Sequence, residues 1–188
     1  YTDGFYYVPR IDKPLIAEYS ENIIATTGGL FGEVPSLILN VGEQQAEEAF
    51  LWWKETLGDN FYAEINRHGL EEEDVVNEVL LRFCAKHDVK YIAANNCYYA
   101  EKKQAEAHDI LLCVKDAQNV SKPKRYIGKR GREFRFGMPN EEWYLKSPAE
   151  MRKLFADLPE GLTNAQAIAD SCESYVLERD VLLPAYEI

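Results

Sequence analysis

One short stretch, residues 91–99, places the strongest constraint on the fold. Its first four residues, Tyr91-Ile92-Ala93-Ala94, are small or apolar, which is typical of a short strand buried on both faces. Asn95 and Asn96 then end the strand, and a helical pattern begins at about Ala100. Strand, polar tip and helix in this order predict an α/β fold, in which functional residues gather at the carboxyl ends of the strands.

Two earlier segments repeat this arrangement. Residues 22–26 and 61–65 are predicted to form buried strands, and the first is followed by a glycine-rich turn at 27–32. The second is followed by Asn66-Arg67-His68-Gly69. If the three strands run parallel, right-handed crossovers place all three tips at the same end of the sheet. That end is the expected functional site.

The helices are predicted from hydrophobic spacing and from their first residues. The acidic run at 71–74 is interpreted as the start of a helix, where the helix dipole favours negative charge, rather than as a metal site. Ser147 and Glu150 form a capping box, and Thr163 is predicted to begin a last helix in the same way. The helix over 100–116 is expected to turn one apolar stripe inward: Ala107, Ile110, Leu111 and Val114.

Composition narrows the class of protein. The chain has 188 residues, 46% of them hydrophobic, which suits one sizeable packed domain. The four cysteines are scattered without a CxxC pair, so a disulfide scaffold is not expected and a cytoplasmic location is. No apolar run approaches the ~20 residues of a membrane span. Because the first residue is Tyr1 instead of methionine, we expect a piece of a longer protein.

Residues 119–138 differ in charge from the rest of the chain. The net charge is −11 overall, which argues against a surface made for nucleic acid, yet this segment holds seven of the 21 basic residues and one acid. Aromatic residues are interleaved with the basic ones, a pattern compatible with phosphate contacts. A solvated loop or hairpin is the preferred interpretation. The candidate phosphate contacts are Lys124, Arg125, Arg130 and Arg132.

The three strand tips hold few catalytic or metal-binding groups. Among the three histidines only His68 lies at a tip, with Glu64 earlier on the same face of its strand. Two ligands are too few for a hydrolytic metal site. A Cys97 nucleophile paired with His68 across two tips is conceivable, but nothing in the sequence orients the pair. We therefore predict no catalytic residue and no metal ligand set in this chain.

Several segments, in a fixed order, resemble one known family. They are residues 24–35 (IATTGGLFGEVP), 66–69 (NRHG), 93–99 (AANNCYY), 105–113 (AEAHDILLC), 143–147 (WYLKS) and 154–159 (LFADLP). Together they resemble the alpha subunit of bacterial DNA polymerase III, in the later part of its PHP (polymerase and histidinol phosphatase) domain. Their order and spacing make the resemblance specific.

The resemblance implies a fold and a division of the chain. Residues 1–118 are expected to hold the later βα units of a partial PHP-type (β/α) barrel with parallel strands, and 119–145 a basic loop or hairpin insert. Residues 146–188 are expected to form a helical C-terminal segment, with an extended stretch at 180–188 leading to a polymerase core. The family's His-x-His strand and the catalytic aspartates of the polymerase palm are expected outside these residues.

The resemblance also implies that the PHP metal site is degenerate. Where metal-binding members have a cysteine, this chain has Gly29, and where they have the aspartate and histidine of a TNDVHY-like tip, it has Asn96 and Tyr98. Glycine offers no ligand, and an asparagine amide binds divalent metals far more weakly than a carboxylate. The expected remnant of the site is a cleft lined by Glu64, His68, Asn95, Asn96 and Tyr98.

The family implies a role in replication. We expect a piece of a DNA-directed DNA polymerase that acts as a scaffold without catalysis of its own, and no cofactor in these residues. By resemblance the parent protein would use Mg²⁺ in its polymerase site, bind DNA, and contact both the rest of the alpha subunit and the proofreading exonuclease subunit. One alternative is a metal-dependent PHP phosphoesterase or exonuclease that uses Glu64 and His68. The other is a nucleic-acid-binding module built on the basic segment.

Overall fold

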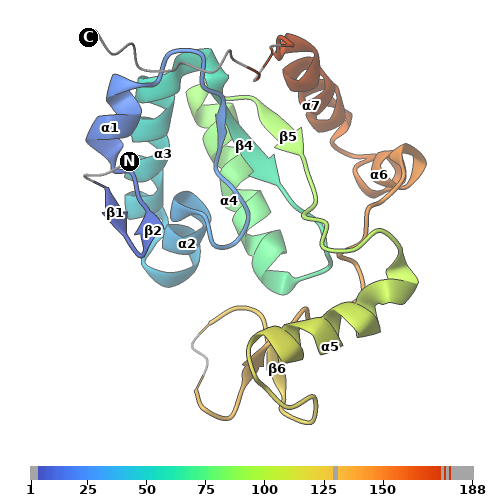
Figure 1. Ribbon diagram of the computed structural model, residues 1–188. Coiled ribbons are helices and arrows are strands. Elements are labelled where there is room, and N and C mark those ends of the chain that lie inside the picture. The colour runs from blue at the N-terminus through green and yellow to red at the C-terminus, as the bar shows by residue number, and fades with distance from the viewer. Residues whose placement is uncertain (1–3, 129–130, 175, 177, 179–188) are drawn as a thin grey trace, which may run out of the picture.

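A parallel sheet forms the centre of the protein (Figure 1). The computed structural model describes residues 4–128, 131–174, 176 and 178. The sheet has three strands in the order β3-β4-β5, formed by Ala25–Thr26, Phe61–Ile65 and Tyr91–Ala93. Both strand pairs are parallel. Parallel strands that alternate with helices confirm the predicted α/β class.

The first strand of the sheet is shorter than predicted. A strand over 22–26 was expected, but only Ala25 and Thr26 pair with β4. Asn22 instead lies in a turn with φ of 63°, a left-handed conformation that asparagine tolerates better than most residues. This turn delays the start of the strand, so Ile23 and Ile24 do not pair with β4.

Three helices supply half of the buried residues of the hydrophobic core. They are α2 (Glu33–Asn40), α3 (Glu43–Leu57) and α4 (Glu71–His87). Phe50 of α3 is fully buried, with its ring 5.1 Å from Phe61 of β4 and 5.5 Å from Phe83 of α4. The acidic residues at 71–74 form the first turn of α4, as predicted from the helix dipole.

The last described helix covers the edge of the sheet. Helix α7 (Pro159–Ser171) packs on β5, where Asn164 donates a hydrogen bond of 2.8 Å to the carbonyl of Tyr91. This contact protects an edge strand that would otherwise present unpaired backbone groups. The prediction that the helix begins at Thr163 is wrong. It begins at Pro159, whose ring fixes the helical φ angle, and the Thr163 hydroxyl donates back to the Pro159 carbonyl inside the first turns.

Short elements complete the described part of the chain. Before the sheet come β1 (Phe5–Tyr6), β2 (Val8–Pro9) and α1 (Lys13–Glu18). Two 3-10 turns, η1 (Gly58–Asn60) and η2 (Lys102–Gln104), precede β4 and α5. Helix α6 (Pro148–Leu154) starts with the predicted capping box, in which Ser147 and Glu150 exchange hydrogen bonds. No helix in the described ranges is both long and apolar enough to span a membrane. The extended stretch expected at 180–188 lies outside the described residues.

Helix α5 (Ala105–Lys115) lies at the periphery, beside β6 (Lys124–Arg125) and β7 (Arg135–Phe136) (Figure 1). The prediction that its apolar stripe faces inward is wrong. Ile110, Leu111 and Val114 have exposed fractions of 47%, 62% and 73%. The helix turns its other side inward because Asp109 binds the buried Arg135, with two hydrogen bonds of 2.7 and 2.8 Å.

Arg67 ties the C-terminal helices to the sheet. It follows β4, and its guanidinium donates to both carboxylate oxygens of Asp157 at 2.6 and 2.8 Å and to the Leu154 carbonyl at 2.8 Å. The same guanidinium lies 5.0 Å from the ring centre of Phe155, which is fully buried. These hydrogen bonds lower the pKa of the Asp157 carboxyl from 3.8 to about 2.

We predict that Gly161→Ala destabilises the protein. A Cβ atom at this position would lie 2.9 Å from the Ala93 nitrogen and 3.1 Å from the Tyr91 ring. Helix propensity alone would favour alanine by about 1 kcal/mol, whereas the clash should lower the free energy of unfolding by about 1–3 kcal/mol. Urea unfolding measures the difference, with the exposed Gln166→Ala on the same helix as the control. A variant at least as stable as the original protein would contradict the packing of α7 on β5.

The Arg67–Asp157 pair should make stability depend on acid pH. Because the pKa of Asp157 is lower in the folded protein, its contribution is complete above about pH 4 and is lost as the pH falls through about 2. Asp157 is mostly exposed, so solvent screening limits the expected contribution to about 1 kcal/mol. Thermal unfolding of the protein and of Asp157→Asn should therefore differ at pH 6 and converge near pH 2. A difference that persists unchanged at pH 2 would show that the effect is not electrostatic.

Candidate functional site

The tips of the three parallel strands converge at one edge of the sheet. Gly29, from the turn after β3, faces Asn66 and Asn96, from the ends of β4 and β5. A Cβ atom on Gly29 would lie 3.2 Å from the side-chain nitrogen of Asn96 and 3.7 Å from that of Asn66. Three turns that are remote in the sequence therefore form one small polar site.

Glu64 supplies the carboxylate of this site. Its Oε2 accepts a hydrogen bond of 2.7 Å from the Thr26 hydroxyl, and its Oε1 accepts one of 3.0 Å from the Asn66 amide. The Glu64 backbone N–H donates to the Thr27 hydroxyl at 2.9 Å. Neutral donors, one on β3 and one directly after β4, therefore hold both carboxylate oxygens.

His68 is fully buried next to this site, and both of its ring nitrogens have protein partners. Nδ1 lies 2.6 Å from a carboxylate oxygen of Glu73, and Nε2 lies 3.1 Å from the backbone carbonyl of Asn96. The other carboxylate oxygen of Glu73 accepts the backbone N–H of His68 at 2.5 Å. The imidazole therefore links the end of β4 to the first turn of α4 and to the tip of β5.

The segment before α6 covers His68 from the outside. The indole of Trp143 stacks on the imidazole with ring centres 3.8 Å apart and planes inclined by 8°. Asn140 donates a hydrogen bond of 2.6 Å to the His68 carbonyl. With Trp143 also fully buried, this cover separates His68 from solvent.

Asn95 and Tyr98 do not line one cleft together. The Asn95 side chain accepts the Arg67 backbone N–H and donates to the Arg67 carbonyl, both at 2.9 Å, so it extends the pairing between β4 and β5. Tyr98 is half-exposed, with its ring 5.7 Å from that of His108. Of the five residues expected in the cleft, Glu64 and Asn96 lie at the small polar site, and His68 lies buried beside it.

Sequence reasoning missed several residues of the site. Asn66 was placed at a strand tip but left out of the expected cleft, although it follows Glu64 by two residues and so shares its face. Glu73 was assigned only to a helix start, although it also holds His68. Asn140 and Trp143 reach His68 from more than 70 residues along the chain, and no local pattern signals such a contact.

These residues do not fit a multinuclear metal site. Within the described ranges, no group of three or more His, Cys, Asp or Glu side chains is placed to hold a metal ion. The small polar site consists of Gly29, Glu64, Asn66 and Asn96, and of these four residues only Glu64 carries a carboxylate. Hydrolytic metal sites need several convergent ligands. Cys97 does not form the conceivable nucleophile pair either, because its thiol contacts the Asn95 carbonyl and both His68 nitrogens have other partners.

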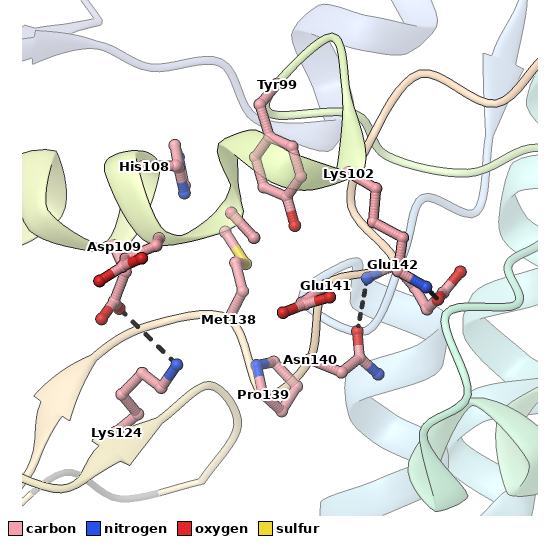
Figure 2. Close-up of a pocket in the computed structure, with 12 residues that line it drawn as sticks. Tyr99, Lys102, His108, Asp109, Lys124, Met138, Pro139, Asn140, Glu141 and Glu142 are labelled. Carbon is pink, nitrogen blue, oxygen red and sulfur yellow. Dashed lines mark hydrogen bonds and ion pairs between the residues drawn. The ribbon is translucent and has the colours of Figure 1, made fainter.

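A pocket of about 560 Å³ lies elsewhere, between α5 and residues 138–142 (Figure 2). Four of its charged groups form two ion pairs: Lys102 lies 2.6 Å from Glu142, and Lys124 lies 4.0 Å from Asp109. Figure 2 shows the Tyr99 phenol pointing into the pocket. Burial is the largest cause that raises the pKa of this phenol, and the nearby carboxylates of Glu141 and Glu142 raise it further. Ion pairs of this kind indicate contacts that hold two packed segments together rather than a hydrolytic centre.

The basic segment divides between surface and interior. Lys124, Arg125 and Arg132 are exposed, and the guanidinium of Arg125 lies 5.1 Å from the ring centre of Phe134. Arg135 is buried against Asp109, so this basic residue serves the fold. Arg130, the fourth candidate phosphate contact, lies outside the described residues.

Comparison with known proteins identifies the family. Residues 1–68 match the family model of the PHP domain. The whole chain is 38% identical to the DNA polymerase III subunit alpha of Borreliella burgdorferi, and covers 16% of that protein. The subunits of Campylobacter jejuni and Treponema pallidum are 36% and 34% identical over 92% and 100% of the chain, which covers 14% and 15% of them. The chain therefore belongs to the family of bacterial DNA polymerase III alpha subunits, and it includes a PHP-domain segment.

Proposed function

We propose that this chain is a non-catalytic scaffold within the alpha subunit of a replicative DNA-directed DNA polymerase. Its sheet and helices would form part of a PHP-type barrel whose metal site is degenerate, and would brace the polymerase core. The observation that carries the proposal is the state of His68, which is fully buried with both ring nitrogens bonded to protein oxygens.

The chemistry at the strand tips supports a structural role. A metal-activated hydrolase needs ligand lone pairs aimed at a common point and an open position for water or substrate. Here the Glu64 oxygens accept hydrogen bonds from Thr26 and Asn66, and Gly29 contributes no ligand. Converting this edge into a hydrolase would require breaking hydrogen bonds that now join the strands.

The activity of the whole protein is part of the proposal. The three relatives named above are DNA polymerase subunits of which this chain spans between 14% and 16%. We infer that the complete protein extends a DNA primer with deoxynucleotides in the cytoplasm. Mg²⁺ would be held by polymerase residues outside this chain. The nearest partner would be the rest of the same subunit, with the proofreading exonuclease subunit as a further one.

We predict that the chain has no saturable site for Zn²⁺ or Mn²⁺ at its strand tips. Isothermal titration should show no binding with a Kd below about 100 μM, and neither metal should raise the melting temperature relative to EDTA. The double variant Gly29→Cys with Asn96→Asp is the positive control. Its two new ligands start from backbone positions that face each other beside Glu64, so it should gain zinc binding.

The opposite outcome is defined for the same titration. Micromolar metal binding by the unchanged chain that is lost in Glu64→Gln would contradict the scaffold proposal. Metal-dependent hydrolysis of a phosphodiester that is lost in the same variant would favour the phosphoesterase alternative. Binding that Glu64→Gln leaves unchanged would place the metal away from this edge.

We predict that His68 contributes to stability. His68→Ala removes a buried ring, its stacking on Trp143 and two hydrogen bonds, so the free energy of unfolding should fall by about 3 kcal/mol. His108→Ala, which alters a partly exposed histidine, should cost less than about 1 kcal/mol. Urea unfolding monitored by circular dichroism measures both. Equal stability of the two variants would contradict the structural role of His68.

A further inference from the structure

Helix α5 carries an apolar stripe on its outer side. The stripe consists of Ala107, Ile110, Leu111 and Val114, and all four are exposed. Their spacing of three, four and seven residues places them on one face of the helix. A face with this periodicity is what a helix normally buries, so the outer stripe is a packing surface for which the described residues provide no cover.

The orientation of α5 is fixed by contacts on its other side. Asp109 receives two hydrogen bonds from Arg135, which is buried, and Cys113 is buried as well. His108 lies next to Tyr98 and Tyr99, with ring centres 5.7 and 5.4 Å away. Turning the outer stripe inward would expose Cys113 and leave the buried Arg135 without its carboxylate. Such a loss is costly, so the stripe stays outside.

The size of the outer stripe favours a cover on the same polypeptide. Four small or aliphatic side chains present a patch of a few hundred Å², whereas a stable interface between separate proteins needs about 800 Å² on each partner. A segment of the same chain needs less area, because covalent connection removes most of the loss of translational freedom. A second copy is disfavoured by the net charge of −11, which opposes self-association.

Relatives of this chain contain the additional polypeptide that this cover requires. The chain spans between 14% and 16% of the relatives named above, so most of each relative lies outside the aligned segment. Figure 1 shows α5 set apart from α2, α3 and α4, where a neighbouring segment can approach it. An apolar helix face of this kind fits an apolar groove or a second amphipathic helix.

We propose that the outer stripe of α5 packs against an apolar surface of the same polypeptide that lies outside these 188 residues. The proposal deepens the scaffold function and rests on it, since it names the surface through which this segment braces the rest of the subunit. The other possible covers are a second copy of the chain and the separate exonuclease subunit, and the test below distinguishes them.

Cysteine labelling in the longer alpha-subunit polypeptide tests the proposal. Leu111→Cys is placed in the stripe, and Asp116→Cys is the control at the end of the same helix, exposed and away from the stripe. Both carry Cys97→Ser and Cys172→Ser, because those two thiols are exposed. Maleimide modification at each position is followed by mass spectrometry of the peptide. In the 188-residue chain the two cysteines should react at similar rates, and circular dichroism checks that both variants fold.

In the longer polypeptide, Cys at position 111 should react at least tenfold more slowly than Cys at 116, at every protein concentration. Equal rates would overturn the proposal. Protection that increases with protein concentration would assign the stripe to a second copy and also overturn it. Protection that appears only after the exonuclease subunit is added would assign the stripe to that subunit and would also overturn the proposal. The scaffold function fails by a different readout, the metal titration at Glu64, so the two failures remain distinguishable.

Discussion

The buried contact between His68 and Glu73 is the interaction on which this part of the protein depends. An imidazole and a carboxylate in a dry interior are costly unless every polar atom has a partner. Here Glu73 holds both the ring and the backbone of His68, Asn96 supplies the second acceptor, and Trp143 closes the remaining face. The contact joins four segments that no single element would hold together: the end of β4, the start of α4, the tip of β5 and the stretch before α6.

Because hydrogen bonds are directional, the contact between His68 and Glu73 also fixes how the side chains at the strand tips are oriented. A histidine whose two nitrogens face protein oxygens keeps a fixed ring orientation, and its neighbours are positioned relative to it. Under the proposed function, a residue type often used to bind metal here maintains the geometry of the sheet edge. The hydrogen bonds of Glu64 act in the same way between β3 and β4.

The sequence predicts those features that depend on nearby residues. The parallel strands, the capping box at Ser147 and the acidic start of α4 follow from patterns within a few residues, and the structure has all three. The orientation of α5 does not, because it is decided by an ion pair between Asp109 and Arg135, 26 residues apart. Periodicity finds the apolar face of a helix, but it does not indicate whether the described residues or another segment cover that face.

The candidate site illustrates the same limit in chemical terms. Counting ligands in the sequence shows how few carboxylates and imidazoles are near the tips, but it does not show which hydrogen bonds those groups make. Several carboxylates at one edge repel one another and need cations between them. With amides at Asn66 and Asn96 and no side chain at Gly29, a single carboxylate remains, and the hydroxyl of Thr26 and the Asn66 amide satisfy it. Under the proposed function, the residues that weaken metal binding at this edge are therefore the same residues that close it through hydrogen bonds, so a weak metal site and a stable scaffold have one cause.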